Sequence, residues 1–136
     1  MEKEELMLRA MEARHMAYAP YTGFAVGAAL LCRDGQVYTG CNIENAALTA
    51  TNCAERTALF KAVSEGEREF EAIAIVGGKA QEPPRGYCAP CGVCRQALAE
   101  FCGADFRIYL GAEGKPTRAY RLSELLPEAF TPQNLS

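Results

Sequence analysis

The sequence of 136 residues contains a single histidine, no long apolar run and no excess of positive charge. Its formal net charge of -3 provides no basic surface of the kind that binds nucleic acid or an anionic membrane. Residues 1–5 lack the apolar core of a signal peptide, and no later run is long enough to span a bilayer. We therefore expect a soluble, cytoplasmic protein that has no nucleic-acid or membrane partner and acts on a small, uncharged molecule.

The scarcity of histidine contrasts with the frequency of cysteine. His15 has no second histidine one helical turn away that would make a metal-binding pair, and we assign it no role. The chain has seven cysteines, which is an odd number, and two of them are spaced as Cys91-x-x-Cys94. Without an export signal, this pattern favours metal or redox chemistry over a framework of disulfides.

The hydrophobic pattern predicts one α/β domain over residues 1–136. We expect helices at about 2–17, 53–65, 91–102 and 123–126, with Ser123 capping the last, and strands at 24–32, 37–43, 72–76, 106–110 and 117–121. The Asp34-Gly35 turn should join the first two strands as a hairpin. The apolar run 72–76 should lie at the sheet centre, and 77–89 reads as a loop. The order of elements predicts a mixed five-stranded sheet covered by helices.

Three cysteines are predicted to lie at the starts of two helices. Cys53 falls in the first turn of one helix, and Cys91 and Cys94 lie one turn apart at the start of another. The positive end of a helix dipole lowers the pKa of a thiol, so all three can be thiolates at neutral pH. Three protein ligands with a fourth position open to water are typical of a catalytic zinc ion. The pattern therefore predicts a zinc site suited to hydrolysis.

Charged residues follow these cysteines in the sequence. Zinc with three thiolates has a net negative charge, and Arg56 is the residue expected to offset it by donating hydrogen bonds to sulfur. Arg95 can donate to the sulfurs in the same way, but a surface position in the first turn of its helix is an equally good interpretation. Glu55 is the candidate proton carrier. However, Asn52 and Glu55 also have the spacing of a helix capping box, which is the competing interpretation of this glutamate.

Motifs along nearly the whole chain resemble one family. Cys53, Ala54 and Glu55, followed by Pro90, Cys91 and Cys94, match the signature of the zinc deaminases, in which the glutamate is not a metal ligand. Further matching stretches are 18–21, 24–30, 40–46 and 125–130. With these residues the sequence resembles the small cytidine deaminases that bind zinc through three cysteines and assemble as homotetramers.

The resemblance implies a three-layer α/β/α cytidine deaminase-like fold with one zinc ion per subunit, bound by Cys53, Cys91 and Cys94. It implies that Glu55 moves protons. The implied substrate contacts are Phe24 against the nucleoside, Asn42 and Glu44 on the ribose hydroxyls, the Ala54 N–H on the base oxygen, the Ala89 carbonyl on the departing amine, and Ala46, Leu48 and Phe130 at sites completed by neighbouring subunits.

The implied reaction is hydrolytic deamination of cytidine and deoxycytidine to uridine and deoxyuridine plus ammonia, in pyrimidine nucleoside salvage. Glu55 would pass a proton from water to N3 of cytosine and then to the leaving ammonia, while zinc activates the water. The residue types at 42 and 44 suit this reaction. A buried amide and carboxylate reject an analogue that lacks a sugar hydroxyl, because they would be left unpaired.

Two features depart from the family pattern. Leu48 stands where the family often has an aromatic residue, which is expected to weaken stacking or widen the range of substrates. The 77–89 loop is longer than usual and introduces Cys88, three residues before Cys91. We predict that Cys88 lies near the metal without binding it, since a fourth cysteine would leave Glu55 no water to serve. Cys32, Cys41 and Cys102 are expected to be small core residues.

Three alternatives remain at the level of sequence. The substrate can be another cytosine nucleoside, such as an aminoacyl-nucleoside antibiotic, treated by the same zinc chemistry. The cysteines can instead form a closed, structural zinc site that includes Cys88. Finally, Cys91 and Cys94 can act as a redox dithiol, although this leaves Cys53 and Glu55 unexplained.

Overall fold

The computed structural model describes all residues, 1–136, and contains every helix and strand that the sequence predicts. The elements in order are α1 (Lys3–Arg14), β1 (Phe24–Cys32), β2 (Val37–Cys41), η1 (Leu48–Ala50), α2 (Ala54–Ser64), β3 (Phe70–Lys79), α3 (Gly92–Phe101), β4 (Arg107–Leu110), β5 (Arg118–Arg121), α4 (Leu122–Leu125) and η2 (Pro132–Leu135). The two short 3-10 helices, η1 and η2, were not expected from the sequence.

The five strands form one mixed sheet, as predicted, and their order is β2-β1-β3-β4-β5. β1 and β2 pair as an antiparallel hairpin, and the turn contains Gly35 with a positive φ of 93°. β3 is central, antiparallel to β1 and parallel to β4. α3 provides the crossover that a parallel pair requires.

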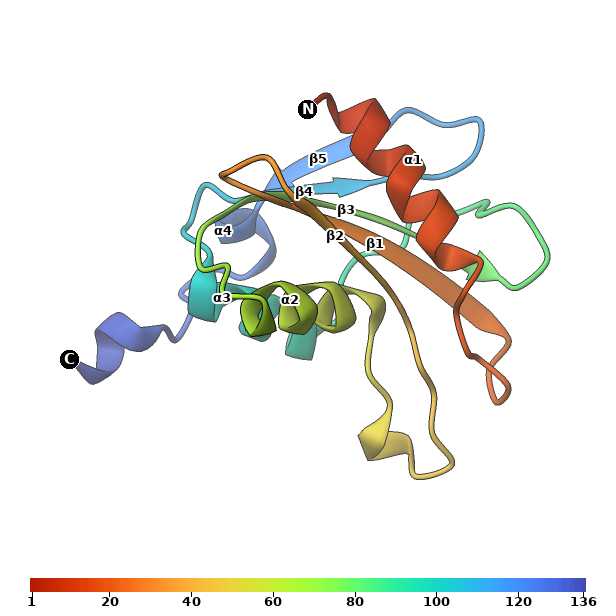
Figure 1. The fold of residues 1–136 in the computed structure, drawn as a ribbon, viewed down its shortest axis with the longest axis horizontal. Helices are drawn as coiled ribbons and strands as arrows, with labels where there is room; N and C mark the ends of the chain where they lie inside the picture. Colours follow the sequence, from red (N-terminus) through yellow and green to blue (C-terminus); the bar gives the residue numbers. More distant parts are fainter.

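The helices cover both faces of this sheet, which gives three α/β/α layers (Figure 1). On one face, Leu6 and Ala10 of α1 pack against Leu31 and Ala74. On the other face, α2 and α3 cover a larger core, whose strand members are Val26, Ala28, Leu30, Cys32, Phe70, Ile73, Ile75, Ile108 and Leu110. Successive residues of β1 and β3 thus belong to opposite layers, as expected for strands buried on both faces.

Glycine at position 40 sets the distance between α2 and the sheet. A Cβ atom on Gly40 would lie 2.6 Å from the carbonyl oxygen of Ala54 and 2.5 Å from the backbone nitrogen of Ala58. No side chain fits in that space, so the first two turns of α2 rest directly on the backbone of β2. This contact fixes the start of the helix that follows Cys53.

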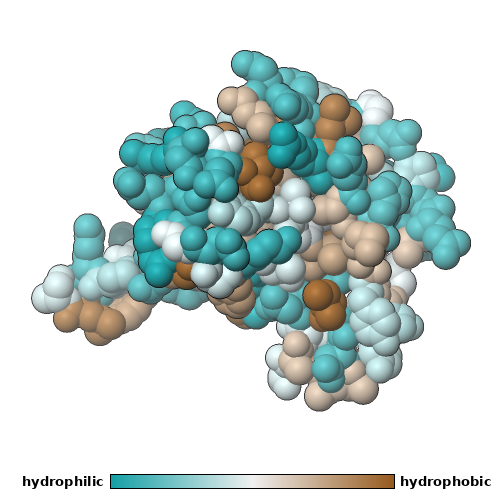
Figure 2. All heavy atoms as spheres, viewed as in Figure 1, coloured by the Kyte–Doolittle hydropathy of each residue, from teal (hydrophilic) through white to brown (hydrophobic).

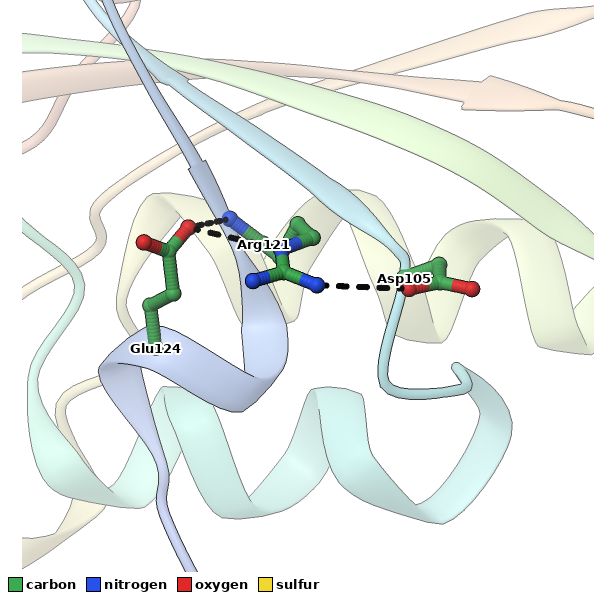
Figure 3. A network of polar contacts seen from close by, with 3 residues as sticks. All are labelled: Asp105, Arg121 and Glu124. Carbon is green, nitrogen blue, oxygen red and sulfur yellow. Dashed lines mark hydrogen bonds and ion pairs between the residues drawn. The ribbon is translucent and has the colours of Figure 1, made fainter.

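Two local predictions were wrong. Residues 77–79 belong to β3 and not to a loop, because Gly77, Gly78 and Lys79 pair with the first residues of β1. Ser123 does not cap α4; the helix begins after Arg121, whose backbone N–H donates to Glu124 Oε1 over 2.8 Å. The Arg121 guanidinium lies between Glu124, at 3.7 Å, and Asp105, at 3.9 Å (Figure 3).

Two segments project from the body of the molecule, one with η1 and one with η2 (Figure 1). Hydrophobic atoms are exposed on both projections, whereas hydrophilic residues dominate much of the remaining face (Figure 2). Leu48, in η1, is 73% exposed, and Phe130, two residues before η2, is 59% exposed. None of the helices has the length and apolar character needed to cross a bilayer.

Candidate metal centre and active site

Three cysteine sulfurs converge where α2 and α3 begin. Cys53 and Cys91 are the N-cap residues of α2 and α3, and Cys94 is buried in the first turn of α3. Their Sγ atoms lie within 4.8 Å of one another, with 3.8 Å between Cys53 and Cys91. None of the cysteines forms a disulfide. The predicted grouping of the three cysteines is therefore present, and the redox alternative fails to account for Cys53 beside the Cys91/Cys94 pair.

The electrostatics of the cluster favour thiolate at Cys53 and thiol at Cys94. The hydrogen bond with Cys94, supported by Arg56, lowers the pKa of Cys53 to about 5. The same shared hydrogen bond raises the pKa of Cys94. Arg56 Nη2 donates to Cys53 Sγ over 3.4 Å, while its buried Nε has no hydrogen-bond partner. Soft sulfur ligands beside the half-buried guanidinium of Arg56 fit a zinc ion with a negatively charged ligand set.

Glu55 lies in the first turn of α2 and is only 4% exposed. Burial is the main reason why the pKa of Glu55 rises from 4.5 to about 7, and negative charge at Cys53 raises it further. The capping-box interpretation is not supported. The helix starts after Cys53, one residue later than that box requires, and the Asn52 side-chain amide donates to Thr57 Oγ1 over 3.1 Å.

The polar segment 42–45 lies next to the residues that lead into Cys53. Ile43 and Asn52 exchange two backbone hydrogen bonds of 2.9 Å. On the other side, the Tyr18 N–H donates to the Asn42 carbonyl over 2.9 Å, and the Glu44 N–H donates to the Tyr18 carbonyl over 2.8 Å. Asn42 and Glu44 are therefore held between the loop after α1 and the approach to the metal cluster.

The side chains of Asn42 and Glu44 are both buried and already hydrogen-bonded. Asn42 Oδ1 accepts from the Val26 N–H and its Nδ2 donates to the Phe24 carbonyl, each over 2.8 Å. Glu44 Oε1 accepts from the N–H groups of Tyr21 and Thr22, and Oε2 accepts from the Thr22 hydroxyl, a contact that lowers the pKa of Glu44. These bonds orient both side chains and fix the backbone beside Phe24.

The remaining predicted substrate contacts differ in exposure. Ala54 is fully buried at the start of α2, and Phe24 is 42% exposed at the start of β1. Ala89 is exposed in the loop before α3. Ala46 and Leu48 are exposed just before and within η1, and Phe130 is exposed two residues before η2. His15, to which no role was assigned, is exposed at the end of α1.

Cys88 is not part of the metal-binding cluster. It is half-buried against Gly77, and burial raises the pKa of its thiol to about 12, with further increases from Glu55 and Cys53. Cys88 thus lies close to the cluster without joining it, which weakens the four-cysteine alternative. Cys32 and Cys102 are buried as expected, and Cys41 is half-buried.

Two contacts were missed at the level of sequence. Thr22 holds the Glu44 carboxylate, and nothing in the sequence marks a threonine that lies 22 residues away as its partner. Arg95 does not donate to sulfur; its guanidinium donates to the carbonyls of Pro90 and Leu125, each over 2.7 Å. Both contacts needed a structure to be found. The first joins segments that are distant in sequence, and the second depends on how α4 packs.

Comparison with known proteins agrees with this site. Residues 1–110 match the model for the cytidine and deoxycytidylate deaminase zinc-binding region. The chain is 50% identical over 136 residues to a cytidine deaminase of Halalkalibacterium halodurans. The aligned region covers 100% of this chain and 99% of that relative. This chain belongs to the cytidine deaminase family. A cytidine deaminase of Sporosarcina psychrophila is 48% identical, over 100% of this chain and 96% of the relative.

Solved structures of the family share the fold. The crystal structure of cytidine deaminase from Burkholderia pseudomallei matches with a TM-score of 0.86 and 45% identity, over 96% of this chain and 100% of that one. The Mycobacterium tuberculosis cytidine deaminase matches with a TM-score of 0.80 and 39% identity, over 96% and 98% of the two chains. The protein is therefore a deaminase, an enzyme of the hydrolase class, with the three-layer fold of that family.

Proposed function

We propose that the protein catalyses zinc-dependent hydrolytic deamination of cytidine and deoxycytidine, giving uridine and deoxyuridine plus ammonia. The observation that carries this proposal is the buried Glu55 beside three convergent cysteines. A structural zinc site needs no buried carboxyl group next to it, whereas hydrolysis needs a proton carrier. The names of the relatives support cytidine as the substrate.

We assign one zinc ion per subunit to Cys53, Cys91 and Cys94. Bound there, the ion would supply Lewis acidity and lower the pKa of a water molecule. The chain supports this role in two ways. The N-terminal ends of α2 and α3 favour negative charge at Cys53 and Cys91, and the Arg56 guanidinium offsets the charge of the thiolates.

Glu55 moves the protons in this proposal. A carboxyl group with a pKa of about 7 can both accept and donate a proton near neutral pH. It accepts a proton from water and delivers it to N3 of cytosine. It then takes the proton of the hydroxyl group added at C4 and passes it to the leaving amine, which departs as ammonia. The backbone N–H of Ala54 would hold the base oxygen, and the exposed carbonyl of Ala89 would accept from the departing amine.

Asn42 and Glu44 are proposed to bind the ribose hydroxyls. A carboxylate has about four acceptor positions, of which Glu44 uses three, and the second amide hydrogen of Asn42 is free. Their existing hydrogen bonds hold both groups in place before substrate arrives, which lowers the entropy cost of binding. Phe24 would pack against the nucleoside from the start of β1.

We further propose a homotetramer in which Ala46, Leu48 and Phe130 complete the sites of neighbouring subunits. Exposed apolar side chains on two projections support such packing. Free pyrimidine nucleosides in cytoplasmic salvage are the proposed context, and one domain over residues 1–136 is the proposed unit. Leu48 is the position at which the range of accepted nucleosides is expected to differ from that of relatives with an aromatic residue.

The test is an assay of the purified, zinc-loaded protein with cytidine. We expect the ultraviolet change from cytidine to uridine, equimolar ammonia, and loss of activity when a chelator removes zinc. Glu55→Gln should bind zinc but lose about 10²- to 10⁴-fold in kcat. Glu100→Gln, at an exposed position of α3, is the matched control and should retain activity. A zinc-loaded parent that leaves cytidine unchanged would contradict the proposal.

A further inference from the structure

Arg95 holds the backbone around one of the zinc-binding cysteines. Its Nε donates to the Pro90 carbonyl over 2.7 Å, and its backbone N–H donates to the Cys91 carbonyl over 3.0 Å. Arg95 also directly follows Cys94 in the first turn of α3. Arg95 therefore holds the backbone carbonyl before Cys91 and the carbonyl of Cys91 itself. It is also the direct neighbour of Cys94 in the sequence.

The second hydrogen bond of the Arg95 side chain ties this segment to α4. Nη1 donates to the Leu125 carbonyl over 2.7 Å. The position of α4 is set by other contacts: the Leu122 N–H donates to the Phe106 carbonyl over 2.8 Å, and Arg121 bridges Glu124 and Asp105 (Figure 3). Leu125 thus offers a fixed acceptor, and Arg95 joins the metal-binding segment to it.

We propose that Arg95 is a positioning residue that keeps Cys91 in the geometry required for metal binding. Pro90 is fully buried, so its carbonyl needs a protein donor in the absence of Arg95. A planar guanidinium can donate to two carbonyls at a fixed spacing, whereas a lysine ammonium on a flexible stem is far less suited to bridge them. This role for Arg95 rests on one part of the proposed function, namely that the three cysteines bind zinc.

This role differs from that of Arg56. Arg56 donates to Cys53 sulfur and so changes the charge around the ligands, whereas both side-chain contacts of Arg95 are to backbone carbonyls. Loss of Arg95 should therefore free the backbone of the Cys91 ligand and speed the release of zinc. Groups that orient metal ligands typically contribute about 10- to 100-fold to metal affinity.

The experiment measures the rate at which the zinc-loaded full chain transfers its metal to a chromogenic chelator. The variants are Arg95→Gln, the conservative Arg95→Lys, and the matched control Arg68→Gln. Arg68 Nη1 donates to the carbonyls of Val63 and Glu67, each over 2.8 Å, at the opposite end of α2 from Cys53. Urea unfolding of each variant shows how much stability is lost.

We expect Arg95→Gln to release zinc about 10- to 100-fold faster than the parent, Arg95→Lys to be intermediate, and Arg68→Gln to stay within about twofold. Release at the parent rate from Arg95→Gln would overturn the proposal. So would equal acceleration in Arg68→Gln, since that would be an effect of stability alone. If Arg95→Gln does not fold, the test uses Arg95→Lys, and zinc release from that variant at the parent rate would overturn the proposal. A parent that binds zinc but does not deaminate cytidine would refute the proposed function and leave this test intact.

Discussion

Replacing Glu55 by glutamine should stabilise the zinc-free protein at alkaline pH and not at acid pH. Glu55 is 4% exposed in the first turn of α2, and burial raises its pKa from 4.5 to about 7. Glutamine has nearly the same shape and no charge. Any cost of burying its amide is the same at every pH, so the pH dependence of the difference between variant and parent isolates the carboxyl group.

The sign of the effect follows from the direction of the pKa change. Below pH 4.5 the carboxyl is protonated in both the folded and the unfolded chain, and the difference in free energy of unfolding is constant. Between pH 4.5 and 7 the unfolded chain ionises first, so the parent loses stability relative to the variant. Above pH 7 the loss is complete and amounts to about 3 kcal/mol, at about 1.36 kcal/mol for each pKa unit.

The assay is urea unfolding of parent and Glu55→Gln at a series of pH values, with a chelator present to keep zinc off the protein. Glu100→Gln, at an exposed position of α3, serves as the control and should show a much smaller change with pH. A difference between Glu55→Gln and the parent that stays constant across pH 4.5 to 8 would refute the reasoning, because it would mean that the folded protein solvates the ionised carboxylate as well as water does.

Three further substitutions test the surroundings of the site. Cys88→Ser should retain zinc and activity while Cys91→Ser loses both, as measured by metal analysis and cytidine turnover; equal loss of zinc in the two would indicate a four-cysteine site. Arg56→Gln should lower zinc affinity about 10- to 100-fold in a competition titration, and an unchanged affinity would show that its contact with sulfur is dispensable. Gly40→Ala should lower the free energy of unfolding by about 1–3 kcal/mol because its Cβ would meet the backbone of α2, and unchanged stability would mean that α2 moves away freely.

The sheet and its layers could be predicted from the sequence because local signals agreed with the final packing. β1 has the predicted bounds of 24–32, since an Asp-Gly turn follows and the run is apolar throughout. β3 was placed correctly at the centre, but its end was missed. Two adjacent glycines indicate a turn locally, whereas pairing with the start of β1 keeps Gly77 and Gly78 in the strand. Such pairing depends on a strand about 50 residues away and has no local signal.

The metal-binding cluster could be predicted for a similar reason. Cys53, Cys91 and Cys94 stand at helix starts that can be recognised in the sequence, and the structure brings their sulfurs within 4.8 Å. The supporting contacts could not be predicted in this way. The bonds of Arg95 to Pro90 and Leu125 require the position of α4. The proposed contributions of neighbouring subunits stay predictions.

Deamination of cytidine in ¹⁸O-labelled water tests the central claim most directly. Hydrolysis replaces the amine on C4 with oxygen from water, so mass spectrometry of the product should show uridine with one ¹⁸O atom and an equimolar amount of ammonia. The zinc-loaded parent should give this product, and Glu55→Gln should give almost none over the same time. Cytidine recovered unchanged from a parent with zinc bound at Cys53, Cys91 and Cys94 would contradict the account.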